Sequence, residues 1–139
     1  MSAGRTVSSR SSPETIVAVI EDDAAARRAL TRMLRAQGVR VASFASAEEL
    51  LHGLTEIRPR CLVIDVMLPG MSGLDLVDRL RADHVVLPAI FVTGRIDALQ
   101  MLRGRGMDDM PCLQKPFEPA LLVQAVTRAL EGEASETRT

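Results

Sequence analysis

The fold is decided by the stretch CLVIDVMLPGMSG, which occupies residues 61–73. Its first part, 61–64, is an apolar run of strand length that ends at the carboxylate of Asp65. The proline and glycines that follow interrupt regular structure, and Leu74, Val77 and Leu80 then recur at helical spacing. A buried strand, a loop and a helix in this order form the repeating unit of a parallel sheet covered by helices.

The same alternation of strand and helix patterns extends outward in both directions from this stretch. Gly38 is expected to stop the first helix, and Ser46 with Glu49 three residues later predicts a capping box for the second. The fold class is therefore α/β, with a doubly wound parallel sheet and helices on both faces. Four other strands are expected: Ile16–Ile20, Val39–Phe44, one through Ile90 and Val92 to Thr93, and one from near Met110 to before Lys115. Three other helices are expected. The first contains Leu30, Met33 and Leu34, the second runs from Ser46 through Leu54, and the third starts at Glu118 with Leu121, Leu122, Ala125, Val126 and Ala129 on one face.

The segment from Ile96 to Asp109 fits the alternation least well. Leu99 and Leu102 begin a helical pattern, but two glycines and two aspartates interrupt it before the last strand. We therefore expect a short or distorted helix here.

Length and composition predict one cytoplasmic domain. The chain has 139 residues, and its net charge of −1 gives no general attraction to nucleic acid or membrane. No apolar run approaches the roughly 18 residues of a membrane span, and the Ser-rich start lacks the apolar segment of a secretory signal. Cys61 and Cys112 lie in apolar runs without metal-binding spacing, so we expect buried, reduced thiols. The expected domain is 15–131, between polar, disordered tails at 1–14 and 132–139.

Polar residues at the strand ends predict a functional site. Glu21, Asp22 and Asp23 follow the first strand, and Asp65, Thr93 and Lys115 end the third, fourth and fifth. In parallel α/β sheets, ligands bind beyond the carboxyl ends of the strands. Clustered carboxylates favour a hard cation such as Mg²⁺, and phosphoryl transfer to an aspartate needs a metal, a cation and hydrogen-bond donors.

Each of these residues also has a purely structural interpretation. Asp22 or Asp23 could cap the first helix, Asp65 could be a turn residue, Thr93 a helix cap, and Lys115 a solvated loop charge. Their joint placement at four strand ends favours the functional interpretation.

Four sequence blocks resemble the signature motifs of response-regulator receiver domains of bacterial two-component systems, the CheY-like, flavodoxin-like fold. They are VIEDD at 19–23, DVMLPGMSG at 65–73, Thr93-Gly94 and KPF at 115–117, and they occur in the family's order. The resemblance covers residues 16 to about 130.

The resemblance implies a five-stranded sheet of order 2-1-3-4-5 and a phosphoacceptor function. Asp65 would accept a phosphoryl group from a sensor histidine kinase or a histidine phosphotransfer protein and lose it slowly, without being a conventional enzyme. The resemblance implies that Asp22, Asp65 and the Met67 carbonyl bind Mg²⁺ directly and that Glu21 acts on it mainly through water. It also implies that Lys115 and Thr93 hold phosphoryl oxygens and that the Lys115-Pro116 peptide is cis. Asp23 matches a position outside the metal shell and is expected to cap a helix.

One residue departs from the family pattern. Cys112 occupies the fifth-strand position where the family has an aromatic side chain that responds to Thr93, so the output face is expected to be atypical. The downstream partner is a protein that the sequence does not specify, and the domain is expected to be a monomer or a phosphorylation-dependent dimer. It is either a stand-alone regulator or part of a longer transcription factor.

Two other function classes stay open at this point. A Mg²⁺-dependent aspartyl phosphatase would need a second aspartate where Met67 stands. A degenerate receiver, used as a constitutive binding module, would account for Cys112.

Overall fold

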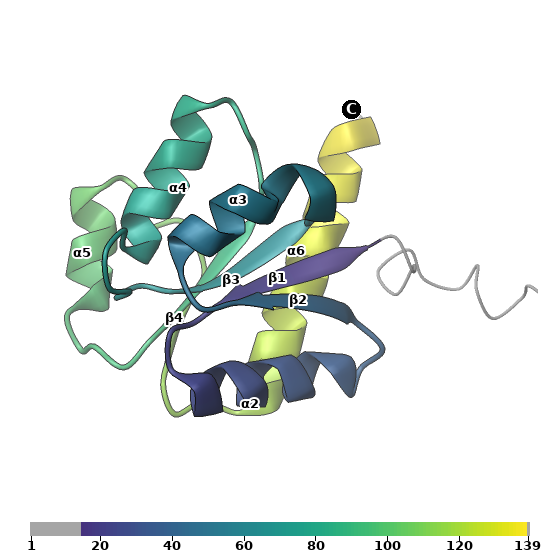
Figure 1. Cartoon of the computed structure of the whole chain (residues 1–139), viewed down its shortest axis with the longest axis horizontal. Helices are drawn as coiled ribbons and strands as arrows, with labels where there is room; N and C mark the ends of the chain where they lie inside the picture. The colour runs from purple at the N-terminus through teal and green to yellow at the C-terminus, as the bar shows by residue number, and fades with distance from the viewer. Residues whose placement is uncertain (1–14, 139) are drawn as a thin grey trace, which may run out of the picture.

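The computed structural model describes the backbone of residues 15–138 and the side chains of 15–132. Five parallel strands form one sheet in the order β2-β1-β3-β4-β5, with helices on both faces (Figure 1), so the expected fold class and strand order are confirmed. The elements are β1 (Ile16–Ile20), α2 (Ala24–Arg35), β2 (Arg40–Phe44), α3 (Ala47–Ile57), β3 (Cys61–Asp65), α4 (Gly73–Ala82), β4 (Ala89–Thr93), α5 (Ala98–Gly104), β5 (Cys112–Gln114) and α6 (Pro119–Arg138).

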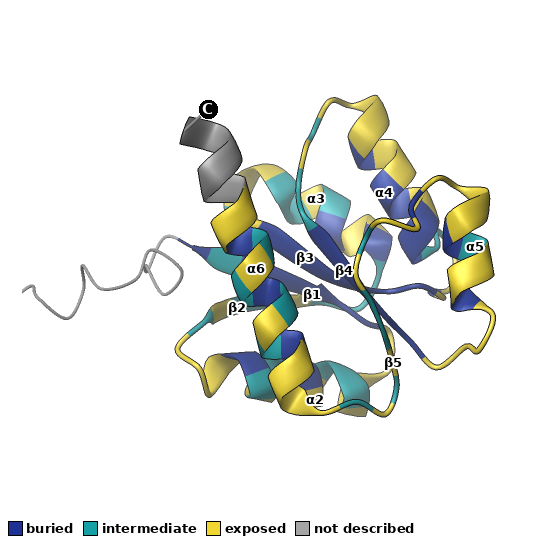
Figure 2. Ribbon diagram, turned by 180° about the vertical axis from the view of Figure 1, so that it is seen from behind, coloured by how far each residue is buried: buried dark blue, intermediate teal, exposed yellow. Residues whose placement is uncertain are grey.

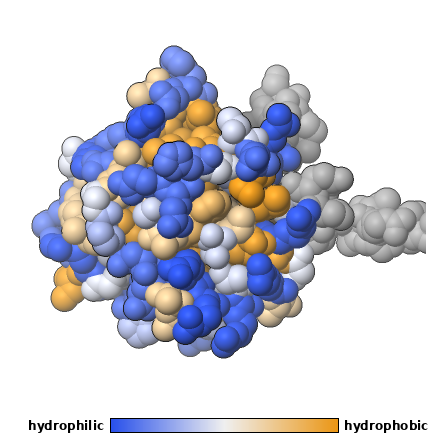
Figure 3. Space-filling model, viewed as in Figure 1, coloured by the Kyte–Doolittle hydropathy of each residue, from blue (hydrophilic) through white to orange (hydrophobic). Residues whose placement is uncertain are grey.

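The core has two layers, one on each side of the sheet. Alternate residues of β1 point to opposite faces, so Ala18 and Ile20 pack with α3, α4 and α5, while Val17 and Val19 pack with α2 and α6. Because β3 and β4 are buried on both faces (Figure 2), they read in the sequence as continuous apolar runs. Hydrophilic side chains cover most of the face shown in Figure 3.

The far end of the sheet is short and irregular. The predicted short helix is confirmed, because α5 has only seven residues and is followed by Gly106 at a φ of +70°. The last strand starts at Cys112 rather than near Met110, because Pro111 has no N–H to pair, although its carbonyl accepts from the Phe91 N–H.

One arginine joins α5 to α4. The Arg105 guanidinium donates to Asp78 at 2.7 Å and to Asp75 at 3.0 Å. The hydrogen bond from Arg105 lowers the pKa of Asp75 below its ordinary value. These two helices are therefore linked by charged groups as well as by their apolar faces.

Several local expectations need correction. The Ser46 hydroxyl accepts from the Glu49 N–H as predicted, but the Glu49 carboxylate accepts from the Ala45 N–H, one residue outside the reciprocal capping box. The helix α3 continues to Ile57 rather than Leu54. Cys61 is fully buried, whereas Cys112 is only partly buried, and both are free thiols.

Both predicted tails lie at the limits of what is described. The helix α6 continues to Arg138 and so includes most of 132–139, while 1–14 lies outside the described residues. Among residues 15–138, no helix is long and apolar enough to cross a membrane.

Candidate functional site

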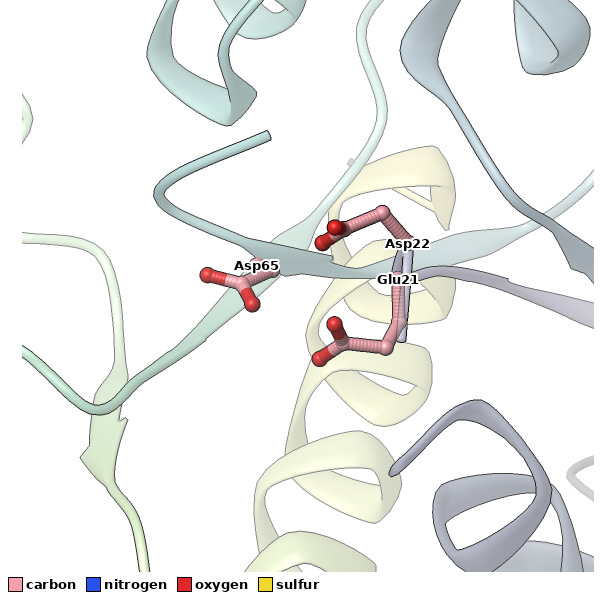
Figure 4. Close-up of side chains that lie close together, drawn as sticks. All are labelled: Glu21, Asp22 and Asp65. Carbon is pink, nitrogen blue, oxygen red and sulfur yellow. The ribbon is translucent and has the colours of Figure 1, made fainter. Parts of the chain in front are cut away.

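Three carboxylates meet where β1 and β3 end. These strands are parallel neighbours, with Ile20 paired to Ile64, so the residues that follow them emerge side by side. One oxygen from each of Glu21, Asp22 and Asp65 lies within 4.8 Å of the others (Figure 4). The sequence prediction that these acidic residues converge agrees with this geometry.

The three carboxylates differ in burial. Glu21 is 1% exposed and Asp65 is 8% exposed, whereas Asp22 faces solvent. Backbone N–H groups hold the two buried ones: Asp23 donates to Glu21 Oε2 at 3.1 Å, and Met67 donates to Asp65 Oδ1 at 3.0 Å. Asp65 is thus fixed in orientation, and Asp22 keeps its oxygens accessible to water.

Lys115 supplies a positive charge that contacts two of the three carboxylates. Its ammonium donates to Glu21 Oε1 at 2.7 Å and to Asp65 Oδ2 at 3.3 Å, so Glu21 is its closer partner. Burial lowers the pKa of Lys115, but the hydrogen bond to Glu21 and the charge of Asp65 outweigh burial and raise it above its ordinary value. The ammonium therefore stays charged at neutral pH, and the Lys115-Pro116 peptide is cis as expected.

Thr93 ends β4 beside these residues. Its neighbour Val92 pairs with Asp65 across the β3–β4 ladder, and the Thr93 carbonyl accepts from the Lys115 N–H at 2.7 Å. The hydroxyl accepts from the Arg95 N–H at 3.0 Å. Thr93 is 1% exposed, so the hydroxyl is held at the base of the loop that leads to α5.

Asp23 does not belong to the cluster. Its carboxylate accepts from the Ala26 N–H at 2.8 Å and caps α2, as the sequence predicted. This contact assigns the capping role to Asp23 rather than Asp22.

Three contributors were not identified from the sequence. Arg27 donates to the Glu21 carbonyl at 2.8 Å, and Glu48 accepts from the loop after Asp65. A Cβ on Gly73 would lie 2.3 Å from the Asp65 carbonyl oxygen, so this residue must be glycine for α4 to start so close to β3. The glycine at position 73 was visible in the sequence, but the contact that requires it was not.

The cluster has the chemistry of a site for a hard divalent cation. Three carboxylates this close repel one another, and one ammonium only partly balances them. Oxygen ligands with water access suit Mg²⁺, which retains several waters when bound to proteins. The residues present therefore fit this metal.

The comparisons with known proteins agree with this geometry. The family described as response regulator receiver domain matches residues 17–127, and the chain belongs to this family. Nodulation protein W of Bradyrhizobium diazoefficiens is 39% identical over 122 residues, which cover 88% of this chain and 54% of that protein. The DNA-binding response regulator MtrA of Mycolicibacterium paratuberculosis is 35% identical, over 86% of this chain and 53% of that protein. This chain thus spans about half the length of these relatives.

Solved structures support the same assignment. The response regulator StyR has 32% identity and a TM-score of 0.76, with 89% of this chain and 63% of that chain covered. The beryllofluoride-activated receiver domain of DrrB has 28% identity and a TM-score of 0.71, with 84% and 97% covered. The chemotaxis protein CheY4 of Vibrio cholerae, at 24% identity, a TM-score of 0.74 and coverage of 84% and 98%, supports the fold alone.

Proposed function

We propose that this receiver domain is switched by Mg²⁺-dependent phosphorylation of Asp65, as part of a cytoplasmic two-component system. The observation that carries the proposal is the convergence of a nearly buried, oriented aspartate, two further carboxylates and one lysine at a single sheet edge. The donor would be a sensor histidine kinase or a histidine phosphotransfer protein.

The transfer itself needs little beyond positioning and charge balance. An Asp65 oxygen attacks phosphorus, the new O–P bond forms as the N–P bond of a phosphohistidine breaks, and the electron pair returns to the imidazole nitrogen. A bound Mg²⁺ supplies positive charge to the phosphoryl oxygens. Asp22, Asp65 and the Met67 carbonyl would hold the ion directly, with Glu21 acting mainly through water.

Lys115 and Thr93 would hold phosphoryl oxygens after transfer. The Lys115 ammonium has three donors and uses two of them, on Glu21 and Asp65, so its third donor would be available to a phosphoryl oxygen. Thr93 would donate its hydroxyl while still bound to the loop that starts at Arg95. Phosphorylation would thereby shift the segment 94–114, a local charge change that biases a two-state element.

Cys112 makes the output of this switch unusual. The thiol lies on β5, next to Phe91 in the ladder, and is too small to act as a swinging ring. Backbone chemical shifts of 94–114, compared with and without beryllofluoride, test whether the segment still responds. Unchanged shifts throughout that segment would reject the coupling while leaving phosphorylation itself intact.

Partners and assembly follow from the proposed switch. Signalling would proceed through phosphorylation-dependent contact with another protein, by a monomer or a phosphorylation-dependent dimer, and this domain would not bind nucleic acid directly.

Intact mass after incubation with acetyl phosphate and Mg²⁺ tests the phosphoacceptor role. The wild type should gain the mass of one phosphoryl group, and Asp65→Asn should not. Asp23→Asn is the matched control, because Asp23 lies at the same edge but caps α2, and asparagine caps helices equally well. A domain that gains no adduct under saturating donor would instead be a constitutive binding module, and repeated turnover of a phosphomonoester would indicate a phosphatase.

A further inference from the structure

The loop of residues 66–72 joins β3 to α4 and carries Met67, whose carbonyl is a ligand in the proposed Mg²⁺ site. Both of its ends are fixed by hydrogen bonds. The Gly73 N–H donates to the Val66 carbonyl at 3.0 Å, and Ser72 caps α4. The Met67 N–H is also held, by Asp65 Oδ1 at 3.0 Å. The Met67 carbonyl belongs to the next peptide group, so its orientation depends on what holds the middle of the loop, residues 68–71.

A glutamate from another element holds that middle. The Met71 N–H donates to Glu48 Oε2 at 3.1 Å, and a Cβ on Gly70 would lie 2.9 Å from the same oxygen. Gly70 has a φ of +73°, so the backbone turns there and passes directly over the carboxylate. Within residues 15–132, this is the one hydrogen bond that ties 68–71 to the rest of the protein.

Packing holds the loop as well, but less specifically. Leu68 is 6% exposed and Met71 packs against the core on the α3, α4 and α5 side. Apolar contacts of this kind have no fixed direction, whereas a hydrogen bond sets the orientation of the peptide group that makes it. The bond to Glu48 thus adds an orientation that packing alone does not give.

The contact differs from helix capping. Glu48 and Glu49 are adjacent in the first turn of α3, yet Glu49 accepts from the Ala45 N–H and closes the start of its own helix. Glu48 instead reaches a segment 23 residues away. Glu48 is also outside the cluster of Glu21, Asp22 and Asp65, so it is not placed to bind the ion itself.

We propose that Glu48 is a positioning residue for the metal site. By holding the Met71 N–H it fixes the middle of loop 66–72, and with it the Met67 carbonyl, before the ion binds. Groups that orient metal ligands raise affinity because less of the binding free energy is spent on ordering them. This inference rests on the proposed Mg²⁺-dependent function.

Two substitutions separate the reach of the side chain from its charge. Glu48→Asp keeps the charge but shortens the side chain by one methylene, whereas Glu48→Gln loses the charge but keeps an acceptor oxygen in place. Isothermal titration calorimetry of the whole chain with Mg²⁺ should show affinity lowered about three- to tenfold for Glu48→Asp and Glu48→Ala, a loss typical of one hydrogen bond. Glu48→Gln should stay within about twofold of the wild type. Glu49→Ala, which removes a neighbouring carboxylate without touching the loop, should do the same.

Amide hydrogen exchange gives a second readout without metal. The Met71 N–H should exchange faster in Glu48→Asp and Glu48→Ala, and near the wild-type rate in Glu48→Gln. A simple loss of helix stability would not produce this pattern, because Glu49→Ala weakens α3 and leaves the Met71 N–H bonded.

Three results would overturn the inference. Wild-type Mg²⁺ affinity in Glu48→Asp would show that the reach of the side chain is irrelevant. Equal weakening in Glu48→Gln and Glu48→Ala would show that Glu48 acts through its charge alone. A wild type that binds no Mg²⁺ would reject the proposed function and this inference together, whereas the first two results reject only the role of Glu48.

Discussion

Replacing Gly73 by alanine should damage both the stability and the phosphorylation of this domain. The added Cβ would lie 2.3 Å from the Asp65 carbonyl oxygen and 2.8 Å from Ile64 Cγ2, where ordinary contact starts at 3.4 Å. The carbonyl belongs to the β3 backbone and the Ile64 side chain is fully buried, so neither can move without disturbing the sheet. Either α4 or the end of β3 must shift by about 1 Å, a strain that typically costs about 1–3 kcal/mol in free energy of unfolding.

Thermal unfolding followed by far-ultraviolet circular dichroism measures this cost, since the chain has no tryptophan or tyrosine for fluorescence. We expect Tm to fall by roughly 3–12 °C. Adduct formation with acetyl phosphate should slow by about tenfold or more, because the displaced backbone carries Asp65.

A matched glycine serves as the control. Gly104→Ala, at the end of α5, places a Cβ with nothing within 4 Å and should be neutral or stabilising by up to about 1 kcal/mol. If Gly73→Ala unfolds at the wild-type temperature and is phosphorylated at the wild-type rate, the close approach of α4 to β3 does not constrain the site.

Three further predictions concern the charged site and its surroundings. Asp22→Ala should remove most of the Mg²⁺ affinity measured by calorimetry. The same change should stabilise the metal-free protein, because it removes one of three mutually repelling carboxylates, and a destabilised metal-free variant would contradict this. Lys115→Ala should lower the free energy of unfolding by about 1–3 kcal/mol in urea titrations, because Glu21 stays buried without its ammonium. Since the pKa of Lys115 is raised in the folded state, its contribution to the free energy of unfolding is present at neutral pH and is lost as pH rises above about 10.5. If Lys115→Ala loses stability at alkaline pH as the wild type does, this contribution of Lys115 is refuted. Burial raises the pKa of Cys112 and hence lowers its thiolate fraction, so iodoacetamide should label it more slowly than free cysteine at pH 8, as peptide mass mapping can check.

The regular part of the fold could be predicted because burial leaves a direct pattern in the sequence. A strand covered on both faces, such as Cys61–Asp65, is apolar up to the residue at its carboxyl end, and each helix repeats apolar residues along one side. The ends of elements were less predictable, because neither the length of α6 nor the start of β5 depends on such a pattern. The shift of β5 to Cys112 follows from the backbone of Pro111, a single-residue effect.

The membership of the site could be predicted, but the connections within it could not. Parallel strands bring their carboxyl ends to one edge, so Asp22, Asp65 and Lys115 were expected at the same edge once the sheet was assumed. That Lys115 lies closer to Glu21 than to Asp65 depends on side-chain conformations that no spacing rule encodes. The contact from Glu48 to the loop likewise joins two segments that are 23 residues apart in the sequence and are brought together only by the fold.

The two ion pairs of Arg105 connect α5 to a helix that starts at the candidate site. Arg105 joins α5 to the first turns of α4, and α4 begins at Gly73, against the carbonyl of Asp65. A protein that binds α5 and displaces Arg105 would therefore remove a contact of the helix that starts beside Asp65, the proposed phosphoacceptor. Under the proposed function, phosphotransfer and partner binding are reciprocally coupled at equilibrium, so a partner that prefers the phosphorylated domain by some factor would favour the phosphorylated state by the same factor. The abundance of that partner in the cell would then help to set how much of the domain carries phosphate.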